Sequence, residues 1–244
     1  MKSFSNTYIF VFAVIMVVIV AVLLAFVSEQ LKPLQEMNVE IEKKSDILHT
    51  VSIAEDLSSV KDKNSFVNSE FDKYITDSYV VNYTGERVDK DAFEITLNMK
   101  AEVAKDPRDR DYPVFVFTGD DGGKKFIVPV RGRGLWGPIW GYLSFEPDMN
   151  TIFGAIYDHE GETPGLGAEI NTSWFEGAFK GKKIFDDNGS FVSVQVVKGG
   201  TPDSNPHGVD AISGGTITSK GLEDMLQDYL EGYVNYFKSQ QVSK

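Results

Sequence analysis

The stretch PVFVFTGDDGGKKFIVPVRG, residues 113–132, predicts a β-hairpin in the middle of this chain. Its two arms, 113–119 and 125–132, alternate β-branched and aromatic residues with others, as strands do. The residues DDGGK between them are a turn signal. Because two strands joined by so short a turn run antiparallel, we expect the hairpin to belong to an antiparallel sheet.

Further strands are expected on both sides of the hairpin, at FEITLNM (93–99), LWGPIWGYLSF (135–145), TIFGAIYD (151–158) and SVQVVKGG (193–200). Few helical patterns separate them, and the helices gather near the two ends of the chain. This order predicts an α+β fold with antiparallel sheets and flanking helices. The charged segment VAKDPRDRDYP, 103–113, is a candidate boundary between two lobes.

A helix is predicted near the C-terminus. Apolar residues recur at the i, i+3, i+4, i+7 spacing that defines one helical face. Thr218 or Ser219 is the expected N-cap, because a hydroxyl there can accept from a free backbone N–H. The face consists of Leu222, Met225, Leu226, Tyr229, Leu230, Tyr233, Val234 and Phe237.

The N-terminal region predicts a membrane anchor. Residues 8–27 form an apolar run without a charge, proline or glycine, long enough to cross the hydrocarbon of a bilayer as a helix. A cleaved secretory signal is the alternative, but its apolar region is usually about 7–15 residues, and no clear cleavage pattern follows Val27. Lys2 and the terminal amine precede the run, and it is followed by Glu29, Glu36, Glu40 and Glu42 together with Lys32, Lys43 and Lys44, so the charge difference across it is small. We therefore expect residues 1–7 inside, 28–60 as a stalk and first helix, and 61–244 as an extracytoplasmic domain.

Composition excludes several classes of function. The net charge of −12 argues against a nucleic-acid partner, which would require a basic patch. The chain has no cysteine, so thiol catalysis and thiolate ligation of iron–sulfur clusters are excluded for it. Its three histidines lack zinc-site spacing, and the acidic residues near Glu160 match no EF-hand. No metal site is expected.

The turn VDAISGGTITSKG, residues 209–221, is a candidate phosphate site. It places serine, two glycines and threonine directly before the predicted C-terminal helix. The start of a helix offers unpaired N–H groups and the positive end of its dipole to an anion. An ordinary loop with a capped helix explains the same residues, because serine, glycine and threonine cluster at helix starts for structural reasons.

Two more glycine-rich segments are candidates for contact with a flat ligand. In DHEGETPGLGAEI, 158–170, the backbone can approach a ring closely, Thr163 can donate a hydrogen bond, and Leu166 can pack on the ring. In RGRGLWGPIWGYL, 131–143, Trp136 and Trp140 stand among glycines. Loop glycines with core tryptophans remain the alternative.

The three segments together resemble a known family. DAISGGT, 210–216, resembles the flavinylation motif Asp-x-x-Ser/Thr-Gly-Ala-Ser/Thr of the FMN-binding domain family. RGRGLWG, GETPGLG and KGG…HGVDAISGGT occur in this order behind one apolar helix, as in the C-subunit family of bacterial Na+-translocating NADH:quinone oxidoreductases. The resemblance implies an FMN joined by a phosphodiester to Thr216, with Asp210 recognised in the motif and Ser213, Gly214 and Gly215 shaping the turn.

The same resemblance implies the remaining site residues. Glu162, Thr163, Leu166 and Gly167 would line the isoalloxazine ring, with Trp136 as a further candidate. One residue departs from the motif, because Gly215 stands where the family usually has alanine. The missing methyl group leaves the turn looser, by up to ~1 kcal/mol of entropy.

The implied function is an electron relay. The chain would be one component of a multi-subunit NADH:quinone reductase, inactive alone, that passes electrons through covalent FMN on the periplasmic side of the bacterial inner membrane. Its partners would be the other membrane subunits and a separate FAD-dependent flavin transferase. The other membrane subunits would carry Na+ across the membrane, because the apolar run of this chain has no ionisable residue.

Two alternatives remain open from the sequence. One is the G-type subunit of the related ion-motive complex that links ferredoxin and NAD, which carries the same type of flavinylated threonine. The other is a membrane-anchored assembly module without a cofactor, in which the glycine loops contact only partner proteins.

Overall fold

The computed structural model describes residues 5–53, 57, 60–202 and 204–242, and the chain divides into two compact units, Met1–Glu42 and Lys43–Lys244. Residues 6–42 of the first unit belong to helix α1 (Asn6–His49), which includes Pro33 without interruption. The apolar run 8–27 is part of this helix, and its side chains are exposed. By length and composition α1 can cross a membrane.

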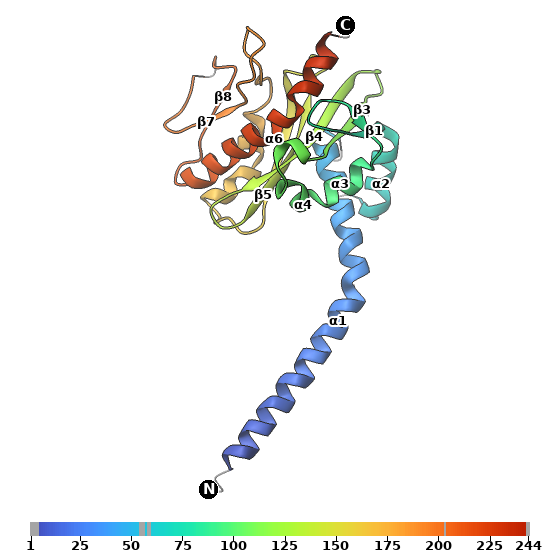
Figure 1. The fold of residues 1–244 in the computed structure, drawn as a ribbon, viewed down its shortest axis with the longest axis vertical. Coiled ribbons are helices and arrows are strands. Elements are labelled where there is room, and N and C mark those ends of the chain that lie inside the picture. The colour runs from blue at the N-terminus through green and yellow to red at the C-terminus, as the bar shows by residue number, and fades with distance from the viewer. Residues whose placement is uncertain (1–4, 54–56, 58–59, 203, 243–244) are drawn as a thin grey trace. The chain divides into compact units, whose positions relative to one another are not determined.

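The second unit is built on a six-stranded sheet (Figure 1). Its strands are paired in the order β2-β1-β3-β4-β5-β6, and every pair is antiparallel. The strands are β1 (Ile75–Val81), β2 (Arg87–Val88), β3 (Tyr112–Thr118), β4 (Lys124–Arg133), β5 (Pro138–Phe145) and β6 (Ile152–His159). The predicted hairpin is β3–β4, with Thr118 opposite Lys124. The segment 103–113 runs from the last residue of α4 (Met99–Val103) through η1 (Pro107–Asp109) to the first two residues of β3.

Helices and a small second sheet complete the unit, and they confirm the predicted α+β class with flanking helices. Strands β7 (Gln195–Val197) and β8 (Gly208–Asp210) pair in parallel. The helical elements are α2 (Lys63–Tyr74), α3 (Ala92–Leu97), α4 (Met99–Val103), η1 (Pro107–Asp109), η2 (Gly167–Asn171), α5 (Ser173–Gly177) and α6 (Thr216–Val242).

The strand predicted at 93–99 is wrong, because this segment forms α3 and the start of α4. The side chain of Asp91 caps α3 by accepting from the backbone N–H of Glu94 at 2.7 Å. Ala92 and Thr96, four residues apart, are both buried. This is a helical period, and the hydroxyl of Thr96 is satisfied by donating to the carbonyl of Ala92 at 2.8 Å. A local cap and burial on one helical face therefore override the β-branched composition.

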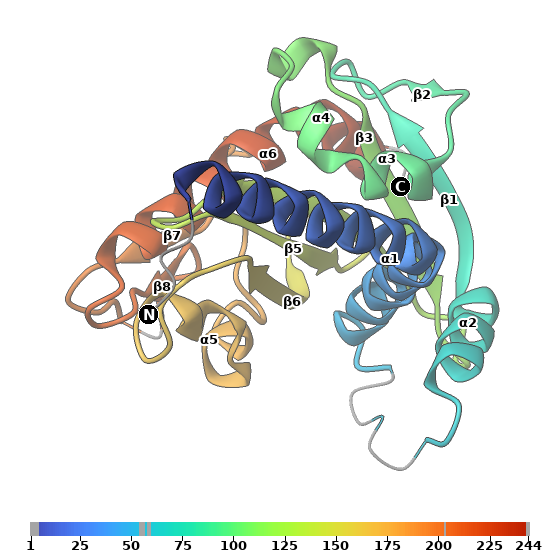
Figure 2. The ribbon, with the colours of Figure 1, turned by 90° about the horizontal axis from the view of Figure 1, so that it is seen from below.

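The predicted apolar face of the C-terminal helix is confirmed in α6. All its members are buried except Val234, which is partly buried and packs against the core. Helix α6 packs on β4, as Figure 1 shows. Glycines allow this close approach, because a Cβ added at Gly132 would lie 2.6 Å from Met225 Cβ, and one at Gly221 would lie 2.2 Å from the carbonyl oxygen of Arg133. Strands β7 and β8 lie beside the first half of α6 (Figure 2).

The predicted N-cap is wrong. Helix α6 begins at Thr216, and the backbone N–H of Ser219 already donates to the carbonyl of Gly215 at 2.8 Å. Thr218 and Ser219 are therefore in the first turn, and both are buried. The hydroxyl of Ser219 accepts from the backbone N–H of Ile212 at 3.1 Å, so it fixes the preceding turn and does not cap the helix.

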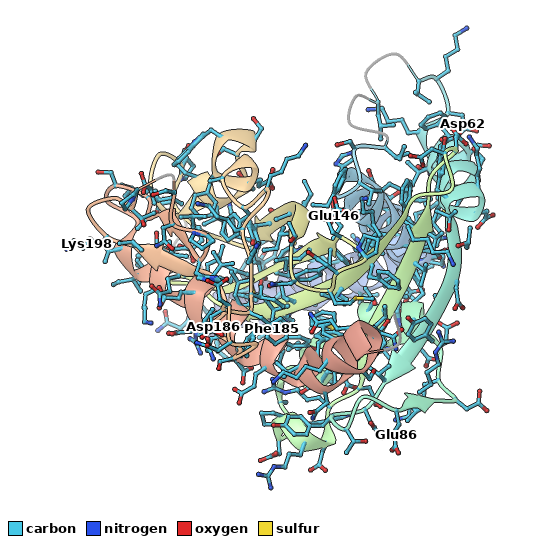
Figure 3. All side chains as sticks on the ribbon, turned by 90° about the horizontal axis from the view of Figure 1, so that it is seen from above. Asp62, Glu86, Glu146, Phe185, Asp186 and Lys198 are labelled. Atoms are coloured by element: carbon cyan, nitrogen blue, oxygen red, sulfur yellow. The ribbon has the colours of Figure 1, made fainter. Side chains whose placement is uncertain are left out.

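Polar contacts hold the chain after α1 and the sheet edges in place. The hydroxyl of Ser144 on β5 donates to the carbonyl of Thr50 at 2.7 Å, and a Cβ at Gly154 on β6 would lie 2.2 Å from the same oxygen. Glu146, labelled in Figure 3, follows β5 and pairs with Lys125 of β4 at 2.8 Å. The strands β4, β5 and β6 thus form a fixed platform for the loops at their ends.

Candidate functional site

A cavity of about 390 Å³ lies where three segments of the domain meet. They are the tip of the β4–β5 hairpin, the loop after β6 and the first turn of α6. In the sequence these segments are far apart, and all three belong to the glycine-rich stretches 131–143, 158–170 and 209–221. The lining residues are Leu135, Trp136, Glu162, Thr163, Leu166, Gly167, Gly214, Gly215, Thr216, Ile217 and Thr218.

Most of the site residues expected from the sequence are brought together here. Those that line the cavity are Trp136, Glu162, Thr163, Leu166, Gly167, Gly214, Gly215 and Thr216. Asp210 and Ser213 are outside the lining. Asp210 ends β8 and accepts from the backbone N–H of Thr201 at 2.7 Å, so it holds the preceding loop. Ser213 is exposed in the turn before Gly214.

Glu162 joins the three segments. Its side chain is buried, and each carboxylate oxygen accepts one hydrogen bond, Oε1 from the backbone N–H of Trp136 at 2.9 Å and Oε2 from the hydroxyl of Thr218 at 2.6 Å. Its own backbone N–H donates to Nδ1 of His159 at 3.2 Å. The carboxylate therefore links the hairpin tip to the first turn of α6 through charge-assisted bonds, which are stronger than neutral ones.

Glycines enclose this carboxylate. A Cβ at Gly134 would lie 2.5 Å from Oε1 of Glu162, and one at Gly167 would lie 2.4 Å from both Oε2 and the hydroxyl of Thr218. Gly214 has φ +77° and would place a Cβ 2.6 Å from Leu166 Cδ2. Gly214 thus supplies both a left-handed backbone and room for Leu166 in the cavity wall.

The two threonines of the first turn have different surroundings. Thr216, the first residue of α6, is exposed, and within the described part of the chain its hydroxyl has no hydrogen-bond partner. Thr218 is 2% exposed and its hydroxyl is engaged by Glu162. The N–H groups that precede Ser219 stand at the open end of the helix, where intrahelical acceptors are lacking. Thr216 therefore combines an accessible hydroxyl with the positive end of a helix.

The walls of the cavity are apolar and partly open to solvent. Trp136 is 69%, Ile217 59%, Leu135 46% and Leu166 42% exposed, although all four are large hydrophobic residues. Apolar walls with few polar groups are typical of small-molecule sites, and the cavity volume lies within their usual range of about 300–1,000 Å³. Glu162 is the single ionisable side chain among the lining residues that the structure describes.

Three lining residues were missed by sequence reasoning. Leu135 and Ile217 are neighbours of predicted residues, and their sequence context has no separate signal. Thr218 was assigned to a cap, whereas it is the donor to Glu162. Trp140, named with Trp136, lies on β5 outside this lining, and the guanidinium of Arg131 lies 5.6 Å from its ring centroid.

The part of the chain that forms this cavity matches a known protein family. The FMN-binding domain family model matches residues 134–231, which include the whole lining. The C subunit of the Na(+)-translocating NADH-quinone reductase of Neisseria meningitidis is 35% identical over 96% of this chain and 93% of the relative. The C subunit of the same enzyme from Vibrio anguillarum is 34% identical over 82% of this chain and 80% of the relative.

Solved structures agree with these relatives. The crystal structure of the Na(+)-translocating NADH-quinone reductase C subunit from Parabacteroides distasonis has a TM-score of 0.73 and 41% identity, covering 85% of this chain and 96% of the other. The crystal structure of NqrC from Shewanella oneidensis has a TM-score of 0.69 and 29% identity, covering 83% of this chain and 98% of the other.

Proposed function

Because this chain belongs to the C-subunit family of Na(+)-translocating NADH-quinone reductases, we propose that it is an electron carrier whose FMN is joined by a phosphodiester to Thr216. The observation that carries the proposal is the contrast between the two threonines at the cavity. Thr216 presents an accessible hydroxyl, whereas the hydroxyl of Thr218 is buried and bonded to Glu162. An acceptor of a flavin phosphate must be reachable, and only the first meets this requirement.

The residues of the cavity fit FMN. The exposed apolar side chains of Trp136 and Leu166 offer surface to an aromatic ring system, and the loop glycines let backbone approach it. The start of α6 favours an anion at Thr216 by about 0.3–1 kcal/mol. No lysine or arginine is among the described residues of the lining, so ionic contacts there contribute little to holding a phosphate. A covalent bond would supply the retention that these contacts lack.

When bound, FMN supplies the electron-transfer chemistry, and the chain supplies position and surroundings. Glu162 fixes the hairpin tip and the first turn of α6 relative to each other, which holds the two walls at a constant separation. Gly214 and Gly215 form the turn that presents Thr216. The incomplete burial of Trp136 and Leu166 leaves one side of the cavity open, as electron exchange with a neighbouring protein requires.

The setting of the domain follows from the same family membership and from α1. We propose that α1 anchors the chain in the bacterial inner membrane as a single span and that the domain is periplasmic. The net charge supports this orientation, because Lys2 precedes the apolar run and four glutamates outnumber the three lysines, Lys32, Lys43 and Lys44, that follow it. The other reductase subunits are the partners, and a separate flavin transferase, using FAD and magnesium, attaches the FMN at DAISGGT.

The attachment site is tested with three threonine variants produced together with the flavin transferase. We expect Thr216→Val to abolish the fluorescence of covalent flavin on the denatured chain in a gel, because no ester oxygen remains. Thr216→Ser, which keeps the hydroxyl, and Thr218→Val, which changes only the buried threonine, should both retain it. A fluorescent band from Thr216→Val would contradict the assignment.

A further inference from the structure

A second recess lies next to the proposed flavin cavity and shares one residue with it. Its volume is about 550 Å³, larger than the cavity beside it, and Trp136 lines both. Trp136 is at the tip of the β4–β5 hairpin, which is closed by the hydrogen bond from the N–H of Gly134 to the carbonyl of Gly137 at 2.8 Å. One exposed indole thus borders both spaces.

The recess is positively charged. Lys100 of α4 and Arg131 and Arg133 of β4 line it together with one carboxylate, that of Glu160, which leaves an excess of two positive charges. Arg131 and Arg133 alternate along β4 with Gly132 between them, so their side chains leave the strand on the same side. The whole chain has a net charge of −12, so this excess is opposite in sign to the rest of the molecule.

Some cations of the domain are paired with carboxylates, whereas the three of the recess have no ion pair within the described residues. Lys90 pairs with Asp111 at 2.7 Å, and Arg110 pairs with Asp228 at 2.6 Å. Among the residues that the structure describes, none forms an ion pair with Lys100, Arg131 or Arg133. The recess therefore has unused capacity for negative charge.

Arg131 is the most enclosed of the three. It is half-buried, its guanidinium lies 5.6 Å from the ring centroid of Trp140, and burial lowers its pKa while Glu160 opposes the shift. A cation taken partly out of water without a hydrogen-bonded partner costs free energy, and an anion seated beside it recovers part of that cost.

We propose that this recess is a docking site for a carboxylate-bearing segment of the neighbouring reductase subunit that exchanges electrons with the flavin. The inference rests on the proposed function, since it is the shared Trp136 that would set such a segment beside the flavin cavity. Charge complementarity supports this occupant. An acidic segment is attracted at the recess and repelled by the acidic remainder of the chain, so one docking position is favoured over the others.

The test uses the full chain in the assembled membrane complex. In the first variant Lys100→Gln and Arg133→Gln are combined, because both side chains are exposed and their loss should not affect folding. In the second variant Arg131→Gln is added. Lys124→Gln is the matched control, since Lys124 is an exposed cation at the other end of the same strand.

Retention of the chain in the purified complex is measured against NaCl concentration, together with the rate at which its flavin is reduced. We expect about tenfold weaker association for the double variant at low salt, a larger loss for the triple variant, and wild-type behaviour for Lys124→Gln. Retention and flavin reduction equal to wild type in both recess variants would overturn the inference, as would an equal loss in the control.

Flavin fluorescence on the denatured chain separates this result from a failure of the proposed function. A wild-type chain without covalent flavin contradicts the flavin assignment and, with it, the docking inference. Recess variants with full flavin fluorescence and unchanged assembly contradict the docking inference alone. Full flavin content combined with loss of the recess variants from the complex at low salt supports both.

Discussion

Glu162 is the residue on which the shape of the candidate site depends most directly. Both of its carboxylate oxygens are used, one by the hairpin tip and one by the first turn of α6. Because the carboxylate is buried, removing either donor leaves one of its oxygens without a hydrogen bond. This costs more stability than the net contribution of one hydrogen bond. The motif residues around it depend on this contact for their relative positions.

We expect Thr218→Val to destabilise the domain by about 1–3 kcal/mol, since it leaves Oε2 of buried Glu162 unpaired while conserving the volume of the side chain. Thr218→Ser keeps the hydroxyl and should recover most of the loss. The free energy of unfolding in urea, followed by near-UV circular dichroism, measures both. If the Thr218→Val chain were as stable as wild type, the hydrogen bond from Thr218 to Glu162 would make no net contribution to stability.

Glu176 gives the domain a pH-dependent stability. Burial raises the pKa of its carboxyl to about 7 from 4.5, while the hydrogen bond from the N–H of Tyr157 at 2.9 Å acts in the opposite direction. Between these two pH values the unfolded chain binds fewer protons than the folded one, so the free energy of unfolding falls as pH rises and then becomes level above about 7.

The variant Glu176→Gln should remove this contribution. Between pH 5 and pH 8, we expect wild type to lose on the order of 1 kcal/mol more stability than the variant does. The effect is this small because the carboxyl group of Glu176 is partly open to solvent. Urea unfolding at both pH values measures it. The same pH dependence in both proteins would show that Glu176 ionises normally.

At the scale of elements, the close approach of α6 to β4 is what positions Thr216. Gly221 and Gly132 allow the helix to lie directly on the strand. The same strand continues into the hairpin that carries Trp136, so helix and hairpin contribute to the cavity from a single packed unit. Burial of one face of α6 supplies the apolar area that holds this arrangement.

We expect Gly221→Ala to destabilise the domain by about 1–3 kcal/mol, although alanine is the better helix former, because its Cβ would lie 2.2 Å from the carbonyl oxygen of Arg133. Backbone at the contact cannot move aside as a side chain can. Gly177→Ala in α5 is the control, since nothing lies within 4 Å of the added Cβ. It should be neutral or stabilising by up to ~1 kcal/mol, and thermal unfolding compares the two. Equal behaviour of both variants would contradict the packing argument.

For the whole molecule, the orientation of the anchor decides which compartment the site faces. Lys2 precedes the apolar run, and four glutamates outnumber the lysines Lys32, Lys43 and Lys44 after it; we take this difference in net charge to favour an extracytoplasmic domain. We expect an alkaline phosphatase fused after Lys244 to be active and a green fluorescent protein fused there to be dark, because each reports folding in one compartment. The reverse pair of results would place the domain in the cytoplasm and remove the periplasmic part of the proposal.

Much of this molecule was predictable because its signals are local. The hairpin 113–132 and the apolar face of α6 depend on periodicity within a few turns or strands, and the structure confirms both. The resemblance of DAISGGT and GETPGLG to family motifs predicted site residues that the fold brings to one cavity, except Asp210 and Ser213. Where local signals competed, at 93–99, the cap by Asp91 outweighed strand composition.

The sequence alone determined the apolar helix and the antiparallel α+β class, and it identified three glycine-rich segments as motifs of one family. Only the tertiary structure decided that Thr218 is buried against Glu162 while Thr216 stays accessible, and that Lys100, Arg131 and Arg133 share one recess. The physical reason is that burial and charge pairing depend on residues distant in the chain. Two threonines with similar local surroundings differ only once Glu162, more than fifty positions earlier, is folded against one of them.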